Sequence, residues 1–103
     1  MSIRTDLERK LLDYPGLVRR RSRFGDGYSY FVGDREIAHF HGDGRLDIRL
    51  THLRIREMKA EGILDRRVRT GGPSANWATL PLAESRDLFL ALELIEETMR
   101  ANA

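Results

Sequence analysis

Two histidines and an aspartate stand close together near the middle of the chain. His39 and His41 are separated by one residue, and Asp47 follows six residues after His41. Residues two apart on a β-strand point to the same face, so both imidazoles can reach one ligand. Asp47 can add a carboxylate, and His52 a further nitrogen. Nearby arginines oppose a dication, so we expect these histidines to form hydrogen bonds on a polar surface, with no bound metal.

A histidine paired with an aspartate can also act as a general base, and His39 with Asp47 suits that role. The nucleophile is missing, however, because Ser29 is predicted on the opposite face of its strand and the other serines lie in no catalytic motif. The chain has no cysteine, which excludes disulfides, thiolate metal sites and a cysteine nucleophile. We therefore expect no cofactor, and a small enzyme with a His/Asp pocket is the alternative to a noncatalytic role.

Basic and aromatic residues alternate along the segments next to these histidines. Of the 18 basic residues, 16 are arginine, and four of them lie within residues 17–23. Arginine forks match phosphate and carboxylate groups, and tyrosine rings offer stacking. The predicted ligand-binding residues are Arg19, Arg21, Arg23, Tyr28, Tyr30, His39, His41, Asp47 and Arg49. The alternative is a solvated sheet face without a ligand.

Short turns predict how these side chains are placed. The turn at 42–44, the loop at 33–36 and the turn at 24–27 would connect neighbouring antiparallel strands. The predicted pairs are His41–Arg45, His39–Asp47, Tyr30–His39 and Arg21–Tyr30. The other face then forms the core, with Val18, Phe31, Ala38, Phe40, Leu46, Ile48 and Leu50. Arg20 is a misfit on that core face, which indicates an edge position or a shifted first strand.

The elements that must position these residues follow from periodicity and from helix-terminating or turn residues. We expect helices at 2–13, 51–61 and 84–100, with Thr51 and Gly62 as the caps of the second. We expect strands at 17–23, 28–32, 37–41, 45–50 and 77–82, and a further strand or an irregular edge at 64–69. The prediction is an α+β fold, an antiparallel four- to six-stranded meander sheet with helices packed on one face, in a single domain over residues 1–103.

Length and composition agree with this fold class. The chain has 103 residues, 41% hydrophobic and 33% charged, and no apolar run approaches the ~20 residues of a membrane span. The first residues lack the apolar stretch of a secretory signal, so we expect a cytoplasmic protein without membrane contact. The net charge of +2 conceals an asymmetry: residues 45–70 carry eight basic and four acidic side chains, and residues 84–100 carry two and five.

Two motifs carry a family resemblance. F-G-D-G at 24–27 and A-H-F-H-G-D-G at 38–44, with a tryptophan segment at Trp77 and a closing helix, resemble small bacterial proteins of a luciferase-domain family. The layout is similar, more remotely, to MmcQ/YjbR-like α+β domains, for which DNA binding has been proposed from the fold. The resemblance implies the fold and assigns no catalytic residue. Nothing in the sequence resembles a light-emitting enzyme, since it has neither a barrel-length chain nor an adenylation loop.

These observations favour a noncatalytic binding or accessory module. Its basic and aromatic sheet face would meet an unknown anionic ligand or a protein partner. Nucleic acid is one candidate ligand, although the chain has only two lysines for sequence-independent phosphate contacts. A second copy of the chain is another candidate partner, because tyrosine and arginine are typical interface residues.

Overall fold

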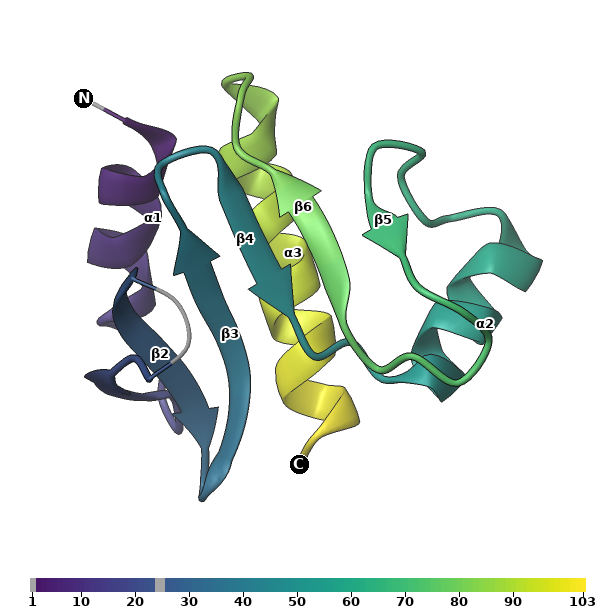
Figure 1. Ribbon diagram of the computed structural model, residues 1–103, viewed down its shortest axis with the longest axis horizontal. Helices are drawn as coiled ribbons and strands as arrows, with labels where there is room; N and C mark the ends of the chain where they lie inside the picture. Colours follow the sequence, from purple (N-terminus) through teal and green to yellow (C-terminus); the bar gives the residue numbers. More distant parts are fainter. Residues whose placement is uncertain (1, 24–25) are drawn as a thin grey trace.

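The computed structural model describes residues 2–23 and 26–103. These residues form three helices and six strands in an α+β arrangement (Figure 1). The helices are α1 (Ile3–Leu11), α2 (His52–Glu61) and α3 (Arg86–Ala101). The strands are β1 (Val18–Arg21), β2 (Asp26–Val32), β3 (Arg35–His41), β4 (Arg45–Ile48), β5 (Arg69–Thr70) and β6 (Ala78–Pro81). The extra strand expected within 64–69 is β5, which begins later and is two residues long.

All strand pairs of the sheet are antiparallel, and the strand order is β1-β2-β3-β4-β6-β5. The first four strands form the expected meander. β6 then pairs with β4, and β5 lies at the edge beside β6. The sheet therefore has β1 at one edge and the short β5 at the other.

The helices α1 and α3 lie behind the sheet in Figure 1 and contact each other there. Alternate strand residues point into this layer, as the period of two requires. The core joins Leu7 and Leu11 of α1 to Leu94 and Ile95 of α3, together with Tyr30, Ile37, Ala38, Phe40, Leu46, Ile48, Ala78 and Leu80 from the strands. No helix is drawn across the front of β3, β4 and β6 (Figure 1). We call this side, which none of the drawn helices covers, the open face of the sheet.

The β3–β4 hairpin has the predicted register. His41 pairs with Arg45, His39 with Asp47 and Ala38 with Ile48 around the turn at 42–44. Gly42 there has a φ of 62°, a left-handed conformation that glycine adopts without steric cost. The predicted caps of α2 are also confirmed: the Thr51 hydroxyl accepts from the Arg54 amide, and Gly62 adopts the left-handed C-cap conformation.

The predicted register of β2 is wrong. Tyr30 pairs with Ala38, not His39, and Ser29 pairs with His39. The cause is a tight turn that pairs Val32 with Arg35, followed by irregularities in the β2–β3 pairing. A shift of one residue moves every side chain of a strand to the other face. Tyr30 therefore lies in the core, 1% exposed, while Ser29 joins the face of the histidines.

The predicted register of β1 against β2 is also wrong. Arg19 pairs with Tyr30, and Arg20 pairs with Ser29, in place of the predicted Arg21–Tyr30 pair. Arg20 is therefore not a charged residue on the core face, because it lies on the open face beside Ser29. Part of the predicted turn at 24–27 lies outside the described residues, since these omit Phe24 and Gly25.

Within residues 2–23 and 26–103, no helix combines the length and the apolar composition needed to span a membrane.

Candidate functional site on the open sheet face

A continuous row of polar side chains crosses the open face of the sheet, with one residue from each strand. Arg20 pairs with Ser29, Ser29 with His39, and His39 with Asp47. Asp47 pairs with Thr79, and Thr79 pairs with Arg69 at the far edge. We call this set (Arg20, Ser29, His39, Asp47, Thr79 and Arg69) the polar row. Cross-strand partners of this kind project from the same face, so the row has a cation at each end and titratable groups at its centre.

The centre of the polar row is a cluster of two imidazoles and one carboxylate. His39 Nε2 lies 3.3 Å from Asp47 Oδ2, and His41 Nε2 lies 3.0 Å from the same oxygen. The two rings meet edge to face, with centroids 4.9 Å apart. The side chains of His39 and Asp47 are 12% and 14% exposed, and that of His41 is 35% exposed. One carboxylate oxygen thus lies within hydrogen-bond distance of two ring nitrogens, at a site that is mostly buried.

Neighbouring side chains orient this cluster. Thr79 Oγ1 donates to Asp47 Oδ1 at 2.9 Å, and Arg45 Nε lies 3.4 Å from that oxygen. Glu36 Oε1 lies 3.4 Å from His39 Nδ1, but this nitrogen makes no hydrogen bond within the described chain. The His39 ring also packs against Trp77, with centroids 5.0 Å apart. Both nitrogens of His39 therefore lie near a carboxylate, and its ring contacts two other rings.

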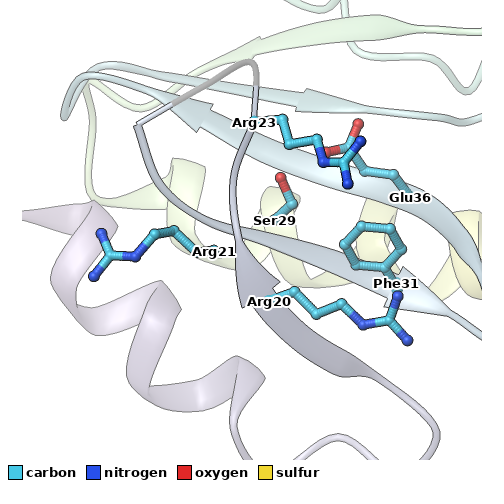
Figure 2. Close-up of a pocket in the computed structure, with 6 residues that line it drawn as sticks. All are labelled: Arg20, Arg21, Arg23, Ser29, Phe31 and Glu36. Carbon is cyan, nitrogen blue, oxygen red and sulfur yellow. The ribbon is translucent and has the colours of Figure 1, made fainter.

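A pocket of about 410 Å³ opens at the β1 end of the polar row (Figure 2). It is lined by Arg20, Arg21, Arg23, Ser29, Phe31 and Glu36. Figure 2 shows the Ser29 hydroxyl pointing toward the side where the Arg23 and Glu36 head groups lie, whereas the Arg21 guanidinium points away toward α1. Arg20 lies over the Phe31 ring, 4.8 Å from its centroid. The pocket therefore combines guanidinium groups, a hydroxyl and an aromatic wall.

A second pocket of about 380 Å³ opens toward β5, and it too contains arginines. Two of its three arginines, Arg67 and Arg45, are already paired with acidic side chains. Arg67 binds the buried Asp87 through both terminal nitrogens and also contacts Glu84, and Arg45 contacts Asp47. Burial would raise the pKa of Asp87, but hydrogen bonds from Arg67 and two backbone amides hold it below its ordinary value. Arg67 therefore serves the fold, which makes the second pocket a weaker candidate for an open ligand site.

The predicted binding residues separate into two groups in the structure. Arg23, His39, His41 and Asp47 lie on the open face, in the pocket or the cluster. Arg19 stacks on the Tyr28 ring at 4.1 Å, on the other face with the buried Tyr30. Arg49 binds Asn102 beyond the end of α3. The predicted platform of interleaved arginine and tyrosine is therefore not assembled, because the β2 register differs.

Four residues that line the pocket at the β1 end of the polar row are not among the predicted binding residues. The sequence places Phe31 on the predicted core face, Arg20 there as a misfit, Ser29 on the face opposite the histidines, and Glu36 in the loop at 33–36. The signal that could have found them is Gly33-Asp34, because a two-residue hairpin turn at this dipeptide pairs Val32 with Arg35.

Comparison with known proteins supports the resemblance seen in the motifs. No curated protein and no solved structure matches the chain. A family model described as Luciferase domain matches residues 34–98, a range that holds the cluster, Glu36, Trp77 and most of α3. Since this match covers more than half of the 103 residues, the chain belongs to the luciferase-domain family.

Proposed function

We propose that the chain is a single-domain, noncatalytic binding module that takes a small anionic molecule in the pocket between β1, β2 and β3. Arg20 and Arg23 supply the charged contacts, Ser29 supplies a hydroxyl, and Phe31 supplies an apolar wall. The observation that carries the proposal is the Ser29 hydroxyl, which is buried without a hydrogen-bond partner in the described chain while its residue lines this arginine-containing pocket.

The energetics of Ser29 favour a ligand. A buried hydroxyl without a partner costs on the order of 1–3 kcal/mol, and native structures contain few such groups. A bound phosphate or carboxylate oxygen would accept a hydrogen bond from this hydroxyl and remove that cost. Arg20 is free to take part, because its side chain is 52% exposed and its contact with Asp34 spans 3.8 Å to a fully exposed carboxylate.

The same geometry favours binding over catalysis. Ser29, His39 and Asp47 are neighbours along the polar row. A serine, a histidine and an aspartate can form a catalytic triad, so the alternative of a small enzyme has to be compared with binding. Among residues 2–23 and 26–103, however, the Ser29 oxygen has no hydrogen-bond partner, so none of them acts as a base that activates it in this arrangement. The His39 ring faces Glu36 and Asp47 with its two nitrogens. A hydroxyl without a base is a ligand contact rather than a nucleophile.

The experiment is a titration of the full chain with phenyl phosphate at low and at high ionic strength, followed by calorimetry. Inorganic phosphate and benzyl alcohol serve as probes of the anion and the ring alone. We expect phenyl phosphate to bind, and the affinity to fall with added salt. Arg20→Gln and Arg23→Gln should each weaken binding about tenfold, because a charged hydrogen bond contributes roughly 1.5–3 kcal/mol.

Arg19→Gln is the matched control, because Arg19 is on the same strand as Arg20 but stacks on Tyr28 on the helix-covered face. It removes the same charge and should leave the affinity within about twofold. Equal losses in Arg19→Gln and Arg20→Gln would reduce the effect to overall charge and contradict the pocket. Binding of benzyl alcohol as tight as that of phenyl phosphate would exclude an anion site.

A further inference from the structure

We propose that His39, His41 and Asp47 together bind one divalent transition-metal ion of the Zn²⁺ type on the open sheet face. This inference does not rest on the anion pocket, because none of the three proposed metal ligands lines that pocket; Glu36 borders both sites. The sequence alone favoured histidines without a metal, since arginines surround them in the chain. The structure supports a metal site in three ways: the donor atoms converge, nearby carboxylates balance the charge of the ion, and the arginine that contacts Asp47 is half-exposed.

The first argument is the spacing of the donor atoms. The two imidazole nitrogens and a carboxylate oxygen all lie within 4.8 Å of one another. The distances from Asp47 Oδ2 are 3.3 Å to His39 Nε2 and 3.0 Å to His41 Nε2. Ligands about 2.0–2.1 Å from a tetrahedral zinc ion stand roughly 3.3–3.4 Å from each other. The two Asp47–histidine distances thus match the edges of a zinc coordination shell, and a rotation of the partly exposed His41 ring would bring the two imidazole nitrogens to the same spacing.

The second argument is the set of groups behind the donors. Metal-bound histidines usually present the other ring nitrogen to a carboxylate or carbonyl, which fixes the tautomer. Glu36 Oε1 lies 3.4 Å from the buried His39 Nδ1, which has no hydrogen-bond partner within the described chain. If a metal takes Nε2, the ring proton moves to Nδ1 and points at Glu36. Thr79 fixes Asp47 in a similar way, through its 2.9 Å hydrogen bond to Oδ1.

The third argument is electrostatic. Asp47 and Glu36 together carry two negative charges, which balance a dication held by neutral imidazoles. Arg45 is the guanidinium that contacts the cluster, at 3.4 Å from Asp47, and its side chain is 49% exposed. A half-exposed arginine can rotate into solvent at little cost. Arg45 therefore competes with the metal for Asp47 without blocking it.

Two imidazoles and one carboxylate leave a coordination position unfilled. Structural zinc sites are closed by four protein ligands, whereas sites with three protein ligands keep a position for water or an exchangeable ligand. All three ligands come from β3 and β4 on the open face, so the remaining position faces away from the sheet. The site is consequently of the exchangeable type, and Zn²⁺ or Co²⁺ is the suited ion because the donors are imidazole and carboxylate.

The experiment is a titration of the full chain with Zn²⁺ and, separately, with Co²⁺. Calorimetry gives the stoichiometry, and the visible absorption of Co²⁺ reports tetrahedral coordination. Trp77, the one tryptophan of the sequence, packs against His39 and should lose fluorescence as Co²⁺ binds. We expect one ion per chain, an intense Co²⁺ band and a melting temperature that rises with Zn²⁺ concentration.

Four variants test the assignment. His41→Gln should abolish measurable binding, and its partly exposed position leaves the fold intact. Glu36→Gln should weaken binding about tenfold, because Glu36 no longer holds the Nδ1 proton of His39 as a carboxylate and so orients this ligand less well. Arg45→Gln should strengthen binding severalfold, because it removes a competing charge from Asp47; a merely structural histidine–aspartate network gains no metal affinity from that change. His52→Gln is the control, since the third histidine is bonded to Asn76 outside the cluster.

The outcomes separate the two proposals. Absence of saturable binding, or binding that His41→Gln leaves unchanged, would overturn the metal site. A loss of affinity in His52→Gln equal to that in His41→Gln would assign the ion to another place. Arg20→Gln should leave Zn²⁺ affinity within about twofold, so failure of the anion pocket and failure of the metal site are distinguishable.

Discussion

Ser29 on β2 and His39 on β3 are direct cross-strand partners, and each carries a buried polar atom without a hydrogen-bond partner in the described chain. The atoms are the serine hydroxyl and the ring Nδ1. Two such atoms on adjacent strands concentrate an unfavourable energy at the middle of the open face. This is the pattern expected where a ligand or an ion completes the site.

Ser29→Ala should separate stability from binding. The change deletes an unsatisfied hydroxyl, so the free energy of unfolding should stay the same or rise by about 1 kcal/mol. The affinity for phenyl phosphate should fall. Urea denaturation and calorimetry measure the two effects. A clear loss of stability would mean that the hydroxyl is already satisfied, and the argument for the pocket would lose its main observation.

Tyr30→Phe should alter the alkaline stability. Burial raises the pKa of Tyr30 to about 12, with a smaller contribution from Glu8. The unfolded chain loses this proton near pH 10 while the folded chain keeps it, so stability falls as pH rises from about 10 to about 12. The full effect is on the order of 2–3 kcal/mol.

Tyr30→Phe should therefore flatten the stability profile in that pH range. At pH 7 the variant should be as stable as the native chain or more stable by about 1 kcal/mol, because it deletes a buried hydroxyl that has no hydrogen-bond partner within the described residues. Thermal melts across the alkaline range test this. Tyr28→Phe is the control, since Tyr28 is only half-buried. An equally steep alkaline fall in Tyr30→Phe would assign the effect to other groups.

Asp87→Asn should destabilise the fold by about 3 kcal/mol at neutral pH, because it leaves the Arg67 guanidinium partly buried without its partner. The Asp87 carboxylate is fully buried and accepts from the amides of Ala83 and Glu84 as well as from Arg67. Its pKa is lowered in the fold, so its stabilisation is present above the ordinary aspartate range and is lost as pH falls.

Urea denaturation at neutral and acid pH measures this effect. Glu84→Gln is the matched control, because Glu84 contacts the same Arg67 at 3.3 Å but is 56% exposed. We expect it to change stability by less than about 1 kcal/mol. If both variants cost the same, burial is not the source of the stabilisation.

Gly62→Ala should destabilise the C-terminal end of α2 by about 1 kcal/mol. Gly62 has a φ of 70°, and nothing lies within 4 Å of an added Cβ, so the cost is backbone strain alone. Gly44→Ala is the control, since it also meets open space and has no positive φ. Thermal melts of both variants measure the difference. Equal melting temperatures would show that the cap does not limit stability.

The sequence predicted the β3–β4 hairpin and the caps of α2 because both follow from local chemistry. Gly42-Asp43-Gly44 fixes one turn, and Thr51 and Gly62 end one helix. The β2 register was wrong because alternation in Tyr28-Ser29-Tyr30 fits either face, and a pairing irregularity decides between them. The sequence did not predict the Arg67–Asp87 pair, because no local pattern indicates a contact between residues 20 positions apart.

β1 leaves one edge of the sheet unpaired, and its sequence is Val18-Arg19-Arg20-Arg21. An exposed strand edge is a template for a strand of another chain. A second copy that approached in this way would bring two runs of three like charges against each other. We therefore expect the arginine run on β1 to disfavour edge-to-edge association of two copies of the chain.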